Sequence, residues 1–208
     1  MNVSRKGWLE AIVRAVVVAG TSTVAGYVLY PYGVFTPNMV AFQFISSGCT
    51  SGLAYASLRS PNARSGLASL VLWFVVLTWL IETFNPWLLA LNTTYVVEIA
   101  GAVFCYEILT QKPLFKLAIS RILLAGVLLT LANALIIVTL DLISVVIARG
   151  HFAWFFRIIG KSLLINTHYG ALIGLAVGCG IEIANLFVTR LNKLLEAHQD
   201  RVSQGVAP

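Results

Sequence analysis

Long apolar stretches alternate with short polar breaks along the whole chain, and this pattern predicts six helices. Each stretch holds about 20 residues or more, the length that a helix needs to cross a bilayer. Pro and Gly stand at nearly every break, as expected where a chain leaves a membrane. The predicted helices are residues 8–30, 39–58, 65–83, 88–110, 117–148 and 158–188.

The composition favours a membrane protein over a soluble one. Hydrophobic residues make up 59% of the 208 residues and charged residues only 11%, whereas a soluble domain carries about 25% charged residues to solvate its surface. We therefore expect one all-α transmembrane domain at residues 1–190 and a short cytoplasmic tail at 191–208. The first apolar run is too long for a signal peptide, which predicts that it is retained as a helix.

The positions of Lys and Arg predict the orientation. They occur in pairs at alternate breaks: Arg5 and Lys6, Arg59 and Arg64, Lys112 and Lys116, Arg190 and Lys193. The breaks at 31–38 and 83–87 contain neither residue, and the break after residue 148 is the exception, with Arg149 and Arg157. Because cytoplasmic loops keep positive charge, both termini should be cytoplasmic, in a membrane that we expect to be the bacterial inner membrane. The cytoplasmic loops then account for the net charge of +6. The sequence has no basic stripe that would indicate nucleic-acid binding.

Small residues recur at four-residue spacing in three of the predicted helices. They are Ala11, Ala15 and Ala19, then Gly48 and Gly52, then Gly170, Gly174 and Gly178. Such faces let helix backbones approach closely. They predict tight packing inside one bundle or, as the alternative, contact with a membrane-protein partner or a second copy, for which the alanine stripe is the first choice.

Three charged residues lie within about two turns of the predicted cytoplasmic helix ends. Arg14, Glu107 and Arg121 are expected to form a charge network on that side, in which Glu107 could pair directly with Arg121. Paired charges near an interface commonly lock helices together.

Other polar residues fall near the predicted bilayer midplane, where an ionisable side chain is a candidate functional group. They are Glu98, His168, Asn133, Gln43 and Asn166. Glu98 and His168 together could bind a polar solute or exchange a proton. His168 is seven residues from Lys161 and fourteen from Glu182, so these three should share one face of the sixth helix, expected to point inward. The alternative is that Glu98 only specifies helix packing.

Two functional classes follow, with an enzyme as a third. The first class is a small solute-binding or transport protein with a polar site near the bilayer midplane. The size, the six helices, the cytoplasmic ends and the alanine-rich first helix resemble the substrate-binding subunits of energy-coupling-factor importers. That resemblance implies a small polar solute and a membrane partner. The other class is a non-catalytic subunit or assembly factor of a larger membrane complex, held by its small-residue faces.

The enzyme alternative depends on Cys49 and His168. With Arg121, they are similar to the Cys, Arg and His of exosortase-type membrane transpeptidases, although the surrounding residues differ from that family's pattern. Burial in an apolar helix disfavours the reactive thiolate. The three cysteines also show no metal-binding or disulfide spacing. We therefore predict a solute-binding protein without catalytic residues, metal ligands or cofactor.

Overall fold

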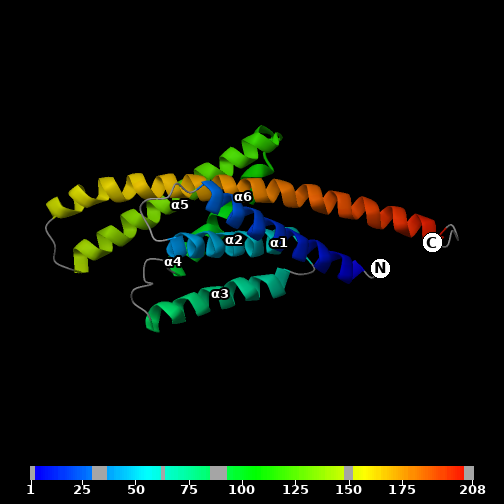
Figure 1. The fold of residues 1–208 in the computed structure, drawn as a ribbon, viewed down its shortest axis with the longest axis horizontal. Helices are drawn as coiled ribbons and strands as arrows, with labels where there is room; N and C mark the ends of the chain where they lie inside the picture. The colour runs from blue at the N-terminus through cyan, green and yellow to red at the C-terminus, as the bar shows by residue number, and fades with distance from the viewer. Residues whose placement is uncertain (1–2, 30–36, 62–63, 85–92, 148–151, 204–208) are drawn as a thin grey trace.

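The computed structural model describes residues 3–29, 37–61, 64–84, 93–147 and 152–203, which are almost entirely helical (Figure 1). The helices are α1 (Val3–Leu29), α2 (Pro37–Arg59), α3 (Arg64–Phe84), α4 (Thr93–Thr110), α5 (Ala118–Ile147) and α6 (Phe152–Ser203), with a 3-10 turn, η3 (Pro113–Phe115), between α4 and α5. The described ranges contain no strand. The all-α prediction is therefore confirmed.

Helix α6 differs most from its prediction. The sequence pattern predicted a helix at 158–188 and a tail at 191–208, but α6 runs without a break from Phe152 to Ser203. Nine of the fifteen residues 189–203 are Leu, Arg, Lys, Glu, Gln or Ala, which are strong helix formers, and the next helix breaker is Gly205. Through Ser203, the predicted tail is therefore a continuation of the last helix.

The helices are arranged around α6, which extends along the whole molecule (Figure 1). Helix α5 packs against α6 most extensively, and α1 packs against both α6 and α2. Helix α4 contacts α5 and α2, while α3 lies at the edge of the bundle against α2 and α4. The beginning of α1 and the end of α6 lie at the same end of the molecule, which we call the N/C end (Figure 1).

The small-residue faces are used inside this bundle. On α2, Gly48 and Gly52 lie directly on the backbone of Ala19 and Ala15 of α1, so a Cβ atom at either glycine would collide with a carbonyl oxygen. Ala15 and Ala19 of the alanine stripe therefore face α2, and contact with another subunit stays a prediction.

The seam between α5 and α6 is equally close. A Cβ atom on Gly174 would lie 2.5 Å from the carbonyl oxygen of Ala125, and Gly170 and Gly178 show similar clashes against α5. The three glycines at four-residue spacing on α6 therefore all face α5, as that spacing predicted.

The outer surface of the bundle is largely apolar. On α5, the exposed residues Leu123, Val127, Leu131 and Leu135 form a stripe at four-residue spacing. Three of the described helices are long and apolar enough to cross a membrane, in the segments Lys6–Val24, Ala118–Leu135 and Thr167–Ala197. Exposed apolar surface of this extent is typical of a chain that meets lipid.

Candidate functional site

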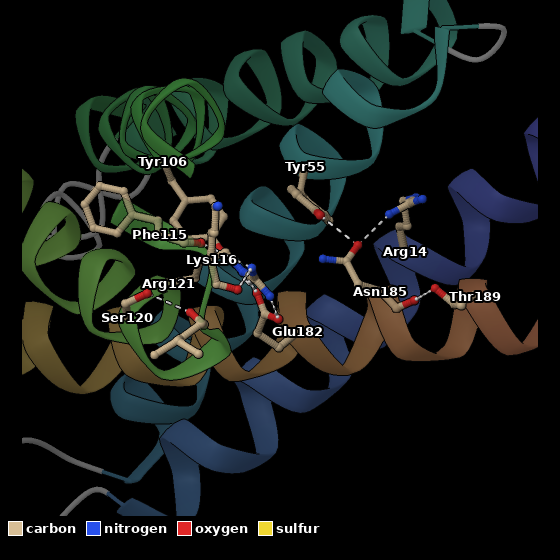
Figure 2. Close-up of polar contacts among 11 residues, drawn as sticks. Arg14, Tyr55, Tyr106, Phe115, Lys116, Ser120, Arg121, Glu182, Asn185 and Thr189 are labelled. Atoms are coloured by element: carbon tan, nitrogen blue, oxygen red, sulfur yellow. Dashed lines mark hydrogen bonds and ion pairs between the residues drawn. The ribbon is translucent and has the colours of Figure 1, made fainter. Parts of the chain in front are cut away.

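Polar side chains from five helices gather toward the N/C end, in a cluster that we call the polar layer. Its members are Arg14 of α1, Tyr55 and Arg59 of α2, Tyr106 and Glu107 of α4, Arg121 of α5, and Glu182 and Asn185 of α6. Most of them are drawn in Figure 2, where Arg121 reaches Glu182 while Arg14 and Tyr55 converge on Asn185. Hydrogen bonds and ion pairs in this layer link α1, α2, α4, α5 and α6.

The Arg121–Glu182 pair joins α5 to α6. Nε and Nη2 of Arg121 donate to the two carboxylate oxygens of Glu182, each at 2.6 Å. Nη1 donates to the carbonyl oxygens of Phe115 and Lys116, at 3.3 and 2.9 Å. The hydroxyl of Tyr106 donates to Glu182 Oε1 at 3.4 Å. Because all three guanidinium nitrogens have acceptors, this arginine is fully engaged by the protein in the strong bidentate geometry.

The second ion pair joins α2 to α4. Arg59 Nε lies 2.8 Å from Glu107 Oε1, while Glu107 Oε2 is buried without a hydrogen-bond partner. The predicted direct pairing of Glu107 with Arg121 is therefore wrong. The reason lies in helix geometry, since successive residues of a helix point about 100° apart. Tyr106 faces α6, and Glu107, the next residue, faces α2.

Arg14 has a different environment. Its Nη1 donates to Asn185 Oδ1 at 2.7 Å, and the same oxygen accepts the Tyr55 hydroxyl at 2.8 Å. The guanidinium carbon lies 5.9 Å from the centre of the Tyr55 ring, within the range of a cation–π contact. Within the described part of the chain, Arg14 forms no ion pair, and its Nε is buried without an acceptor.

Of the five predicted midplane side chains, the structure describes Glu98, His168 and Asn133, and it records no hydrogen bond or ion pair among these three. Glu98 is half-buried on α4, about 12 Å along the helix from Tyr106, and its Oε2 is enclosed without a partner. His168 is exposed on α6. Asn133 is buried in the α5–α6 seam beside Gly170, where its Nδ2 donates to Leu129 O at 3.3 Å. The side chains of Gln43 and Asn166 lie outside the described residues.

The outward position of His168 has a geometric cause. The residues of α6 that touch α5 follow a four-residue spacing, Gly170, Gly174 and Gly178. Each four-residue step turns the contact line by about 40° around a helix of 3.6 residues per turn. The inward face at Glu182 is therefore no longer the inward face at His168, and the prediction that the two share one inward face is wrong. The side chain of Lys161 lies outside the described residues.

The proposed catalytic trio is also separated. Arg121 is bound to Glu182, which lies fourteen residues, or about 21 Å, from His168 along α6. Cys49 is half-buried on α2. Among the described side chains, no group of three His, Cys, Asp or Glu residues could hold a metal ion. The arrangement provides interhelical bonding and one arginine with unused hydrogen-bond donors.

Sequence reasoning placed Glu182 on an inward face, but it did not identify the pairing of Glu182 with Arg121, nor Tyr55, Arg59 and Asn185 as members of the site. One signal was present, because Glu182 and Asn185 are the polar residues of adjacent turns in an otherwise apolar part of α6. In the comparisons with known proteins, the chain matches no protein-family model, no curated protein and no solved structure.

Proposed function

We propose that this chain is a six-span protein of the bacterial inner membrane, with both termini cytoplasmic, that serves as a non-catalytic subunit or assembly factor of a membrane complex. The observation that carries the proposal is the length of α6. Its 52 residues extend about 78 Å, whereas a bilayer measures about 40–45 Å with its headgroups. If α6 spans a bilayer, about 30 Å of the helix projects beyond it, counted over both ends.

The outer surfaces of the remaining helices support six spans. Helix α3 has an exposed apolar face made by Leu70, Leu72, Trp73, Val76 and Leu80. It lies at the edge of the bundle beside α2 and α4, where lipid would cover this face. Exposed basic residues Arg64, Lys112 and Lys116 stand at the α2–α3 and α4–α5 connections, as the positive-inside rule requires of the cytoplasmic side.

The apolar segment Thr167–Ala197 of α6 extends past the polar layer, but charged residues become frequent from Arg190 onward, so the projecting part begins there under this proposal. From Arg190 to Ser203 the helix continues for about 20 Å, and it presents Arg190, Lys193 and Leu194 to the outside. Leu194 is 69% exposed. An apolar side chain flanked by cations on a helix outside the membrane is a suitable contact for a partner protein, whereas the polar layer holds the bundle together.

Site-specific photocrosslinking in native membranes tests this proposal. A photoreactive residue in place of Leu194 should form a discrete protein–protein crosslink. The matched control is Leu164, which is 75% exposed on the same helix but lies toward its other end. Crosslinking there should be to lipid. If Leu194 and Leu164 give the same lipid-only products, the subunit proposal is contradicted.

Solute binding is the second candidate, and the specific observation in its favour is Glu98. A carboxylate oxygen enclosed without a partner is costly in a protein interior, and such groups occur at sites that bind solutes or protons. Under this proposal, Glu98→Gln should abolish the stabilisation given by a polar solute in a thermal-shift screen while leaving the stability of the solute-free protein nearly unchanged. If no solute discriminates Glu98→Gln from the parent, this candidate is removed.

A further inference from the structure

The three arginines of the polar layer differ in what neutralises them. Arg121 and Arg59 each pair with a carboxylate, Glu182 and Glu107 respectively. Arg14 has only the neutral amide oxygen of Asn185 and the face of the Tyr55 ring. Removing a guanidinium from water without an opposite charge is expensive. Arg14 is therefore the one arginine of this layer whose charge the described protein leaves uncompensated.

The hydrogen bonds of Arg14 leave one edge of its guanidinium without an acceptor. Nη1 is used by Asn185, whereas neither Nε nor Nη2 donates to any group that the structure describes. Nε and Nη2 are the two nitrogens with which Arg121 holds the carboxylate of Glu182. Nε of Arg14 is enclosed by the protein, so Nη2 is the nitrogen that can donate to a carboxylate or phosphate oxygen from outside. The guanidinium of Arg14 is therefore a candidate site for a carboxylate or phosphate group.

The charges around this position favour an anion. On α6, Arg190 and Lys193 are exposed, about 8 and 12 Å beyond Asn185, and on α1 Lys6 lies about 12 Å beyond Arg14. Glu10, one turn before Arg14 on α1, forms no ion pair with it. Clustered cations raise the local concentration of anions near a site.

We propose that Arg14 binds the phosphate group of an anionic membrane lipid. Arg14 lies in the apolar segment Lys6–Val24, eight residues from its beginning, and Tyr55 and Asn185 fix the guanidinium from the two neighbouring helices. Arg14 is therefore a little more than two turns inside the segment, a depth from which a long arginine side chain can reach the headgroup region. Free inorganic phosphate offers the same chemistry and is separated from lipid by experiment.

The test uses the full chain in detergent, with phosphatidylglycerol, phosphatidylcholine or inorganic phosphate as the added probe. Native mass spectrometry counts retained lipid, and a thermal melt reports the stabilisation. The parent should retain phosphatidylglycerol in preference to phosphatidylcholine, and Arg14→Gln should weaken that retention about tenfold or more, the value of one charge-assisted bond. The matched control, Arg190→Gln, removes an exposed cation from the same end and should change retention little.

Each outcome decides the proposal. If inorganic phosphate gives the same stabilisation and Arg14→Gln removes it, the oxyanion site stands and its ligand is free phosphate. If Arg14→Gln and Arg190→Gln weaken retention equally, the binding is general surface electrostatics and the site is overturned. A crosslinked acidic protein at this position with no lipid preference would overturn it as well.

Two further variants keep the test decisive if Arg14→Gln does not fold. Arg14→Lys keeps the charge but loses the planar guanidinium, which can donate to Asn185 and to a phosphate at the same time, so it should retain phosphatidylglycerol less well than the parent. Asn185→Ala frees Nη1, so it should lower the melting temperature without lipid and enlarge the shift that phosphatidylglycerol produces. A shift that shrinks in Asn185→Ala would overturn the proposal.

Discussion

The two junctions that α6 makes in the polar layer differ in how their arginines are used. At the α5–α6 junction, Arg121 is saturated by Glu182 and two backbone carbonyl oxygens. At the α1–α6 junction, Arg14 meets a neutral amide and an aromatic ring. Both are single arginines on apolar helices, near the same end of the bundle. An arginine on an apolar helix therefore holds helices together to the extent that other groups of the protein accept its hydrogen bonds and neutralise its charge.

The helices also pack more closely at the α5–α6 junction than at the α1–α6 junction. The α5–α6 seam brings three glycines of α6 onto the backbone of α5, so Arg121 lies beside a rigid contact. At the α1–α6 junction a single glycine, Gly180, lies on Val18 and Ser22 of α1, at 3.1 Å or more from an added Cβ atom. The tighter seam should therefore be the more sensitive to substitution, and the predictions below test that ranking.

The largest effect is expected from breaking the Arg121–Glu182 pair. Arg121→Met leaves the mostly buried carboxylate of Glu182 without its partner, which costs about 3–5 kcal/mol for a buried pair and falls toward the lower figure here because Arg121 is 27% exposed. Chemical unfolding in detergent measures the loss. The double variant Arg121→Met, Glu182→Leu should recover most of it. A double variant no more stable than Arg121→Met would contradict a pairing role.

The next effect concerns the glycine seam. Gly174→Ala places a Cβ atom 2.5 Å from Ala125 O and 2.7 Å from the Cα of Gly126, both backbone atoms. Such overpacking costs about 1–3 kcal/mol, and Gly174→Leu should cost more. The control is Gly160→Ala on the same helix, where a Cβ atom meets nothing within 4 Å, so stability should stay the same or rise. Equal melting temperatures for the two alanine variants would mean that α5 and α6 do not touch at Gly174.

The smallest effect separates the two tyrosines. Tyr55→Phe removes a 2.8 Å hydrogen bond to Asn185, whereas Tyr106→Phe removes a 3.4 Å bond to a carboxylate that Arg121 already satisfies. A typical hydrogen bond contributes about 1 kcal/mol, so Tyr55→Phe should cost about that and Tyr106→Phe less. Thermal melts of the two variants, which have the same change in composition, provide the comparison. The reverse order would mean that Tyr106 is the more important link.

The fold was largely predictable because helix length, helix breakers and small-residue spacing are local properties of the sequence. The close contacts of Gly48, Gly52 and Gly174 follow from spacing alone. The end of α6 was not predicted, because falling hydropathy after Val188 was interpreted as the end of the helix, whereas helix propensity remains high through Ser203. Hydropathy reports the solvent around a helix, and it does not report where the helix stops.

The candidate site was less predictable because pairing depends on how helices rotate against each other. Arg14, Glu107 and Arg121 were singled out by charge, but their partners Asn185, Arg59 and Glu182 depend on which face each helix turns inward. His168 was assigned to the interior by a seven-residue spacing, while the actual seam follows a four-residue spacing. Whether His168 is buried therefore depends on how α5 crosses α6, which the residues around His168 do not reveal.

The most direct test of the contrast between the two arginines measures Arg14→Gln and Arg121→Gln side by side, in phosphatidylcholine and in phosphatidylglycerol. The melting temperature of Arg121→Gln should fall by the same amount in both lipids and keep the extra stabilisation that phosphatidylglycerol gives the parent. Arg14→Gln should lose only the contribution of its hydrogen bond to Asn185 in phosphatidylcholine, less than Arg121→Gln loses, and it should lose the phosphatidylglycerol stabilisation. If both variants lose stability equally in the two lipids, the two arginines have the same structural role and the contrast is wrong.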